Sequence, residues 1–171
     1  MFRMFAYVQK QNRRLMTASE IFQKSCYYNA DFTINQNKCV QQAVMRFAEL
    51  DIGCVAVIDD KERFIGLFSE RDFIKKVAAS GKESAAIQIK EICTKLVDVI
   101  VANPHDSLND CIRKIHGKKI RHLPIIGDNQ ELQGLISTKD LFAAQIQDNS
   151  HSFEQFMTEK MIFTLGKNPY I

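Results

Sequence analysis

Short apolar runs alternate with amphipathic stretches along this chain, and their order predicts a mixed fold of helices and strands. Residues 32–34 have the composition of a short strand, and apolar positions across residues 40–48 recur at the three- and four-residue spacing of an amphipathic helix. Residues 54–58 and 64–68 predict two further strands, because both are apolar runs of strand length that flank a polar connection. A second helix is predicted to end at Gly81. The predicted order is strand, helix, strand, strand, helix.

The same order returns 68 residues later without a gap. Residues 66–72, with the sequence GLFSERD, match residues 134–140, with the sequence GLISTKD. Residues 100–101 match the first predicted strand, and the apolar run at 122–126 matches that at 54–58. A repeat of a whole supersecondary unit indicates duplication, and each half alone is too small for a comfortable core. We therefore expect an α/β fold of the α+β type, in which two β-α-β-β-α repeats pack sheet to sheet with pseudo-twofold symmetry.

The repeat divides the chain into five segments. Apolar residues within 87–93 indicate that the stretch between the repeats docks on them and is not a free linker. Gly53 is expected to end the first helix of the first repeat, because glycine commonly follows the last helical residue. The segments are a basic N-terminal arm (1–29), repeat 1 (30–81), a docking connector (82–98), repeat 2 (99–147) and a C-terminal tail (148–171).

The N-terminal arm has the composition of a mitochondrial presequence. Residues 1–19 contain four basic side chains, no acidic one, and interleaved apolar side chains. The same composition suits an ordinary basic surface arm, so the predicted location is mitochondrial on the first interpretation and cytoplasmic on the second. The C-terminal tail carries apolar residues at roughly helical spacing from Phe153 onward, and we expect it to dock on the repeats, to bind a partner or to stay disordered.

Charge and cysteine content exclude several classes of function. The 23 basic and 20 acidic residues give a net charge of +3 and form no basic stripe, which argues against nucleic-acid binding. The apolar runs are of strand length, so no membrane span is predicted. The five cysteines include no C-x-x-C pair and no common zinc-ligand spacing, and we interpret them as reduced structural thiols.

The repeated Ser-x-x-Asp pattern has two compatible interpretations. Ser69 and Asp72 precede an apolar helical run, as Ser137 and Asp140 do, which is typical of a capping box at a helix N-terminus. A helix N-terminus also binds phosphate, because its free N–H groups and its dipole favour an anion. A nearby carboxylate can accept hydrogen bonds from ribose hydroxyls. The pattern is therefore both a candidate cap and a candidate ligand site.

No pattern in the sequence predicts catalysis. His105, Asp106 and Ser107 are the residue types of a hydrolase triad, but neighbours in sequence cannot point at one another as a triad requires. We interpret this stretch as a helix start, with Asp106 or Ser107 as the cap and Asp110 at the box position. The sequence has no H-E-x-x-H, G-x-G-x-x-G or Walker pattern. We expect no enzyme, no metal site and no obligatory cofactor.

The repeated motifs resemble those of the cystathionine-β-synthase (CBS) domain. The SERD and RHLP runs are similar in particular to those of stand-alone CBS-pair proteins of bacteria and of plant mitochondria. On this resemblance, which covers most of the chain, the protein is identified as a tandem CBS pair, or Bateman module. The stretches that carry the resemblance are residues 51–58, 66–73, 89–94, 121–126 and 134–141.

The resemblance implies a disc-shaped module with two clefts that take adenosine-containing ligands. Ribose hydroxyls would lie on Asp72 in one cleft and on Asp140 in the other, with Ser69 and Ser137 beside the α-phosphate. Further implied phosphate contacts are Arg71, Lys139, Arg121 and His122. The groups implied to flank adenine are the backbone of Thr33, Ile34, Val101 and Ala102 and the side chains of Val57 and Ile125.

The two halves depart from the family pattern in different places. Residues 24–28 stand where the family usually has a segment ending in Met-Thr, and Cys93 replaces the usual methionine in the second copy. Gly53 occupies the position equivalent to Arg121, so the halves carry different charge. We therefore expect one cleft to bind a phosphorylated ligand better than the other, or alone.

Two functions are compatible with these observations. The first is a regulatory module that binds an adenine nucleotide (AMP, ADP, ATP or a related adenosyl ligand) and modulates a partner. The alternative is a structural accessory subunit of a mitochondrial assembly, with empty or vestigial clefts. Protein partners are expected at the N- and C-terminal tails, or in a homodimer formed through the helices of the repeats.

Overall fold

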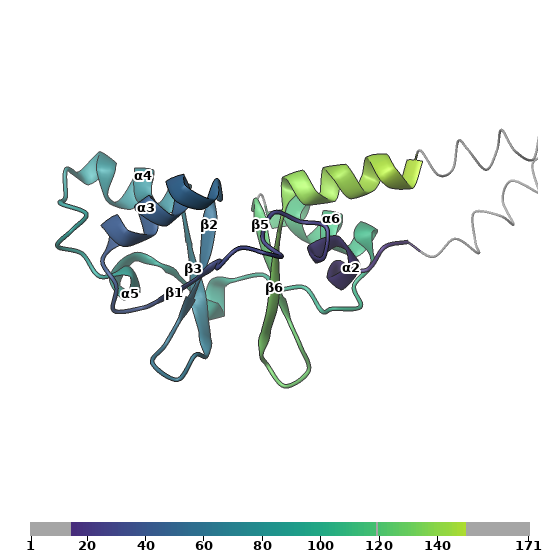
Figure 1. Cartoon of the computed structure of the whole chain (residues 1–171), viewed down its shortest axis with the longest axis horizontal. Helices are drawn as coiled ribbons and strands as arrows, with labels where there is room; N and C mark the ends of the chain where they lie inside the picture. Colours follow the sequence, from purple (N-terminus) through teal and green to yellow (C-terminus); the bar gives the residue numbers. More distant parts are fainter. Residues whose placement is uncertain (1–14, 119, 150–171) are drawn as a thin grey trace, which may run out of the picture.

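The elements of the molecule follow the predicted order, in a computed structural model that describes residues 15–118 and 120–149 (Figure 1). The basic residues of the presequence pattern and the apolar residues of the C-terminal tail lie outside the described residues. Repeat 1 comprises β1 (Thr33–Asn35), α3 (Val40–Leu50), β2 (Cys54–Ile58), β3 (Phe64–Ser69), α4 (Glu70–Lys76) and the 3-10 helix η1 (Ala78–Ser80). Repeat 2 comprises α6 (Leu108–Lys118), β5 (His122–Ile126), β6 (Leu132–Ser137) and a helix over residues 138–149. The elements outside the repeats are α2 (Ala18–Phe22), α5 (Ile89–Ile92), β4 (Thr94–Lys95) and the 3-10 helix η2 (Leu96–Asp98).

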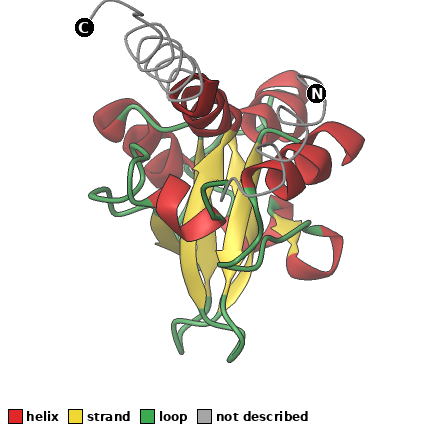
Figure 2. Cartoon of the chain, turned by 90° about the vertical axis from the view of Figure 1, so that its right-hand side faces the viewer, coloured by secondary structure: helices red, strands yellow, loops and turns green. Residues whose placement is uncertain are grey.

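Two sheets stand next to each other at the centre of the molecule, and helices lie on their outer sides (Figure 1). α3 and α4 flank the first sheet, whereas α2, α6 and the helix over residues 138–149 flank the second. The strands run through the middle of the molecule when it is seen from its side (Figure 2). The first sheet has the order β1-β2-β3-β4, and the second consists of β5 and β6. The prediction of an α+β fold with two repeats packed sheet to sheet is confirmed.

The hairpin of repeat 2 reproduces the hairpin of repeat 1. Each residue pair of the antiparallel β2–β3 ladder has its equivalent, 68 positions later, in the β5–β6 ladder, and the register shifts at the equivalent place in both. Each turn also contains one non-glycine residue with a left-handed backbone, Glu62 (φ 59°) in the first and Gln130 (φ 62°) in the second. The duplication therefore extends to backbone conformation and not only to residue type.

The first strand of repeat 2 is reduced to a bridge. The sequence predicts a strand at residues 100–101, but the structure has an isolated parallel bridge between Ala102 and Ile125. Ala102 N–H donates to the Pro124 carbonyl at 2.8 Å, and the Ala102 carbonyl accepts from Ile126 N–H at 2.9 Å. These two hydrogen bonds use both backbone groups of Ala102, so one residue occupies the place that β1 has in repeat 1.

α3 ends earlier than the glycine pattern predicts. Its last residue is Leu50, and Asp51 adopts a left-handed backbone with φ 51° and ψ 42°. Aspartate visits this conformation more readily than most residues, because its short polar side chain can hydrogen-bond locally. The prediction that Gly53 ends the helix is therefore wrong. The predicted end of the next helical region is confirmed, since Gly81 follows η1 with φ 66°.

Each repeat is covered by the segment that precedes the other repeat in sequence. α2, ahead of repeat 1, packs on β6 and α6 of repeat 2, where Ala18 N–H donates to the Asp106 carbonyl at 2.8 Å. α5, ahead of repeat 2, lies against repeat 1, where Ile89 N–H donates to the Lys38 carbonyl at 3.0 Å. This exchange means that neither repeat is complete without the chain that leads into its partner.

The exchanged segments explain the glycine that begins each copy of the repeated motif. A Cβ added at Gly66 would lie 2.1 Å from the carbonyl oxygen of Thr94, in β4. A Cβ added at Gly134 would lie 2.7 Å from the ring of Phe22, in α2. Glycine is the residue that permits such a close approach, because it has no side chain. The glycine recurs in both copies because a neighbouring segment, β4 in one repeat and α2 in the other, lies directly against it.

The hydrophobic core is continuous between the halves. One cluster of buried residues belongs mainly to repeat 1 and another to repeat 2, but Leu135 of β6 belongs to the first cluster and Phe22 packs against both. Cys54 and Cys111 are buried in the two clusters, and all five cysteines are free thiols. The interpretation of these two cysteines as small hydrophobic residues is confirmed.

Candidate functional site

A capping box begins the helix that follows each repeated motif. At α4, Asp72 N–H donates to Ser69 Oγ at 3.3 Å, while the N–H and hydroxyl of Ser69 donate to Asp72 Oδ2 at 3.1 Å and 2.7 Å. At the start of the last helix, the N–H and hydroxyl of Ser137 both donate to Asp140 Oδ2 at 2.6 Å, and Asp140 N–H donates to Ser137 Oγ at 3.4 Å. The capping interpretation is therefore confirmed. In both capping boxes the aspartate accepts hydrogen bonds through Oδ2, and Oδ1 takes no part in the cap.

The second carboxylate oxygen distinguishes the two motifs. Oδ1 of Asp72 lies 2.8 Å from Nζ of Lys76, one helical turn further on. The equivalent of Lys76 in repeat 2 is Ala144, which is buried. Within residues 15–118 and 120–149, no side chain bonds to Oδ1 of Asp140. Asp140 thus presents an open acceptor where Asp72 presents an ion pair.

The starts of β2 and β5 meet between the two halves. A Cβ added at Gly53, just before β2, would lie 3.0 Å from Oε2 of Glu70 and 3.6 Å from Cε1 of His122. The His122 ring also meets the ring of Tyr27 edge to face, with centroids 6.1 Å apart and an interplanar angle of 87°. Gly53 therefore lies against two side chains that come from different repeats.

Positive charge gathers around His122. The pKa of His122 is lowered to about 4, mainly by burial and also by the guanidinium groups of Arg121 and Arg71. The pKa of the Cys54 thiol is raised, first by burial and then by the carboxylate of Asp72. The positive charge of Arg121 acts in the opposite direction and lowers it. The Arg121 carbonyl accepts from Thr138 N–H at 2.9 Å, at the start of the last helix. Arg121 is therefore connected to both repeats, and His122 is neutral at pH 7.

Lys139 and Asp140 lie near the segment that leads into repeat 1. The pKa of the Cys26 thiol is raised, first by burial and then by the carboxylate of Asp140, while the ammonium of Lys139 lowers it. Tyr27, next in sequence, has a raised pKa, mainly because it is buried. The second motif thus faces residues 24–28, the segment that departs from the family pattern.

The residues expected to flank adenine take part in the core of the molecule. Four of these residues are buried and form two equivalent parallel pairs. The pairs are Ile34 with Val57 in repeat 1 and Ala102 with Ile125 in repeat 2. The carbonyls of Thr33 and Val101 point away from this pairing, and each accepts a hydrogen bond from a basic side chain of a helix. The donors are Arg46 to Thr33 and Lys114 to Val101.

A pocket of about 300 Å³ lies at the outer edge of β1. It brings together Thr33 and Ile34, but neither Ser69 nor Asp72 lines it. Within the pocket, Arg46 pairs with Asp31 at 3.0 Å. The pocket therefore joins two of the residues expected to flank adenine and none of those expected to bind ribose or phosphate.

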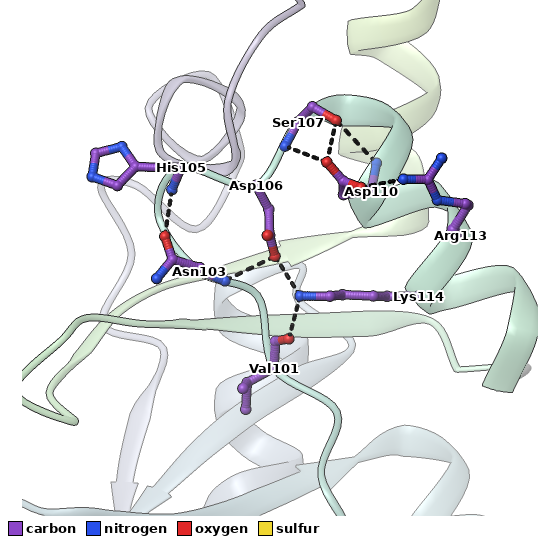
Figure 3. Close-up of polar contacts among 8 residues, drawn as sticks. All are labelled: Val101, Asn103, His105, Asp106, Ser107, Asp110, Arg113 and Lys114. Carbon is purple, nitrogen blue, oxygen red and sulfur yellow. Dashed lines mark hydrogen bonds and ion pairs between the residues drawn. The ribbon is translucent and has the colours of Figure 1, made fainter.

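The stretch considered as a hydrolase triad is a helix start. Asn103 N–H donates to Asp106 Oδ2 at 2.9 Å, and Lys114 pairs with the same carboxylate (Figure 3). Ser107 and Asp110 form the capping box of α6, in which Ser107 N–H donates to Asp110 Oδ2 at 3.1 Å. The interpretation of Ser107 as a cap with Asp110 at the box position is confirmed, and the His105 ring points away from both (Figure 3).

Four features of the site are not predicted from the sequence: the ion pair of Lys76, the packing around Gly53, the contact of Tyr27, and the basic residues that bind strand carbonyls. Only the last left a clear signal. Arg46 and Lys114 occupy equivalent positions in the repeat, and both are basic. Within the described part of the chain, no group of three or more potential metal ligands is found, and no helix there is long and apolar enough to cross a membrane.

The family model of the CBS domain matches residues 32–79 and 89–147. An uncharacterized protein of Methanopyrus kandleri is 28% identical over 116 residues, which cover 64% of this chain and 58% of that protein. The mitochondrial CBS domain-containing protein CBSX3 of Arabidopsis thaliana is 22% identical over 118 residues, which cover 68% of this chain and 57% of that protein. This chain spans less than two thirds of the length of both relatives.

Solved structures have the same arrangement. A CBS-domain protein from Burkholderia ambifaria superposes with a TM-score of 0.69 at 30% identity, over 78% of this chain and 96% of that one. A CBS domain protein from Pyrobaculum aerophilum, solved in complex with AMP, superposes with a TM-score of 0.64 at 18% identity, over 73% of this chain and 89% of that one. With two family matches that coincide with the two structural repeats, this chain belongs to the CBS-domain family, as a tandem pair.

Proposed function

We propose that this chain is a regulatory module that binds an adenine nucleotide (AMP, ADP, ATP or a related adenosyl ligand) and changes its affinity for a protein partner. The observation that carries the proposal is the duplicated Ser-x-x-Asp motif at two helix starts, with the charges of Arg71 and Arg121 both acting on His122. A bound AMP in a CBS protein of the same fold supports the choice of ligand.

Each group of the motif has a role in this proposal. Asp72 and Asp140 accept hydrogen bonds from ribose hydroxyls through the oxygen that the capping box does not use. Ser69 and Ser137 place the helix N–H groups beside the α-phosphate. The phosphate charge is offset by Arg71, Lys139 and Arg121, with His122 as a neutral hydrogen-bonding group. The backbone of Thr33, Ile34, Val101 and Ala102, with the side chains of Val57 and Ile125, contacts adenine.

Calorimetric titration of the full chain with AMP, ADP and ATP tests the proposal. Replacing both ribose carboxylates, as D72N/D140N, is expected to weaken binding about tenfold or more, because a hydrogen bond to a charged group contributes roughly 1.5–3 kcal/mol. Asp110→Asn is the matched control, since it alters the same kind of capping box in α6, outside the repeated motif. It should leave affinity unchanged.

The absence of saturable heat with all three nucleotides, for a folded wild-type chain, would contradict the proposal. That result would favour the alternative, a structural accessory subunit with unused clefts. Equal weakening by D110N and D72N/D140N would show that helix capping, and not ligand contact, explains the effect.

The partner in this proposal packs on the helices that follow the motifs. Ile74 of α4 and Phe142 of the last helix occupy equivalent positions, and both are large apolar residues that are 60% and 69% exposed. A second copy of the chain or another protein would cover them, because apolar patches that stay exposed commonly mark interaction sites. A mitochondrial location is supported by the Arabidopsis relative.

A further inference from the structure

We propose that Lys76 makes the two ribose sites unequal: it closes Asp72, so that a nucleotide binds first at Asp140. This inference rests on the proposed function and specifies which of its two sites acts. It concerns a positioning residue, since Lys76 acts through the carboxylate of Asp72.

Lys76 is held by two acceptors. Its Nζ lies 2.8 Å from Oδ1 of Asp72 and donates to the carbonyl of Ile92, at the end of α5, at 2.7 Å. An ammonium group has three N–H donors, so these two contacts define most of its orientation. The Ile92 carbonyl belongs to the connector between the repeats, which gives the lysine a fixed anchor outside its own helix. The ammonium therefore lies against Oδ1 of Asp72, the oxygen that the capping box leaves unused.

A ribose hydroxyl that approaches Asp72 has to displace this ammonium or share the oxygen with it. A partly exposed ion pair of this kind weakens a competing contact by about fivefold, which corresponds to the upper range measured for surface pairs. Asp72 is 19% exposed and Lys76 is 39% exposed, so the pair is accessible and its strength is moderate. Lys76 therefore lowers the affinity of the first site without abolishing it.

Repeat 2 lacks this obstacle. Ala144 stands in the position of Lys76, and a methyl group cannot pair with a carboxylate. This difference favours ligand binding at Asp140.

Calorimetry with adenosine and with AMP, on the full chain, tests the inference. Adenosine has no charge, so removing the charge of Lys76 does not alter its attraction to the protein. In the wild type, Asp140→Asn should remove the tighter site, whereas Asp72→Asn should remove the weaker site and leave the tighter one unchanged. In a D140N background, Lys76→Met should strengthen the remaining site about fivefold for adenosine. Lys76→Arg should keep the wild-type behaviour, because arginine preserves the pair.

The outcomes separate this inference from the proposed function. If the wild type binds a nucleotide but K76M/D140N binds no better than D140N, Lys76 does not close the first site and the inference is wrong. Loss of the tighter site by D72N in place of D140N also overturns it. If the wild type binds neither adenosine nor AMP, the proposed function itself fails. A merely structural role of Lys76 would lower stability in K76M but would not strengthen binding.

Discussion

The two repeats share the backbone of their hairpins and of the helix starts that follow, and they differ in the side chains around their motifs. Strand register, the register shift, the turn conformation and the capping box all recur 68 residues apart. The differences lie at Lys76 against Ala144 and at Gly53 against Arg121. Backbone hydrogen bonds constrain both hairpins in the same way, whereas side chains around the motifs can diverge without changing the hairpin. The two copies have therefore retained the same hairpin backbone, while the side chains that surround each motif have changed.

A similar difference appears in the hairpin turns. In repeat 1, the pKa of Asp59 is lowered to about 2, mainly by a hydrogen bond from the Arg63 side chain at 2.8 Å. The N–H groups of Arg63 and Lys61, which donate to Asp59 at 2.9 Å, also lower it. The equivalent residue in repeat 2 is Gly127, which has no side chain to do this. The turn of repeat 1 is thus stabilised by a charged group that repeat 2 lacks.

The largest effect is expected from the motif glycines. Gly66→Ala should destabilise the protein by about 3 kcal/mol, and Gly134→Ala by about 1–2 kcal/mol, because overpacking in a filled core typically costs about 1–3 kcal/mol. A Cβ at Gly66 meets backbone of β4, which cannot move alone, whereas one at Gly134 meets the ring of Phe22, which can turn. Urea unfolding of the two variants measures the difference. A greater loss of unfolding free energy in G134A than in G66A would contradict the expectation that Phe22 yields to the added Cβ more easily than the backbone of β4.

An effect smaller than that of Gly66→Ala is expected from His122, whose equivalent in repeat 1 is Cys54. The folded-state pKa of His122 is lowered to about 4, so the folded chain resists a proton that the unfolded chain accepts near pH 6.5. Stability is complete above about pH 6.5 and falls as the pH decreases toward 4, by roughly 2 kcal/mol at pH 5 for this residue. His122→Cys supplies the residue of repeat 1 and removes this titration.

Urea unfolding of the wild type and H122C at pH 7.5 and pH 5 measures the contribution of His122. The wild type should lose more free energy of unfolding than the variant over this interval. Equal losses in the two proteins would mean that His122 is not kept neutral by its position between the arginines and the buried ring of Tyr27.

The sequence predicts those parts of the fold that depend on periodicity within one repeat. The apolar runs and the 68-residue offset predict the strands, the helices and the two capping boxes, because each depends on neighbours in sequence. The exchange of α2 and α5 depends on contacts between distant segments, so it leaves no local pattern. The left-handed Asp51 ends α3 where a glycine is not required, and one bridge at Ala102 replaces the predicted strand.

The site is only partly predictable for the same reason. The Ser-x-x-Asp motifs are local patterns, and both aspartates lie where the repeat predicts them, at helix starts. Whether Oδ1 of each aspartate is free to accept another hydrogen bond depends on the residue four positions further on. The sequence shows lysine in one repeat and alanine in the other, but only the structure shows that Lys76 pairs with Asp72. The roles of the ribose, phosphate and adenine contacts stay predictions until a ligand is bound.

The amide chemical shifts of Asp72 and Asp140 during a titration with AMP test the central claim most directly. Both amides lie in equivalent capping boxes, so each reports on its own motif under the same conditions. The account predicts that the Asp140 amide shifts at lower AMP concentration than the Asp72 amide. A shift of Asp72 first would contradict the inequality assigned to Lys76, and no shift of either amide at saturating AMP would contradict nucleotide binding itself.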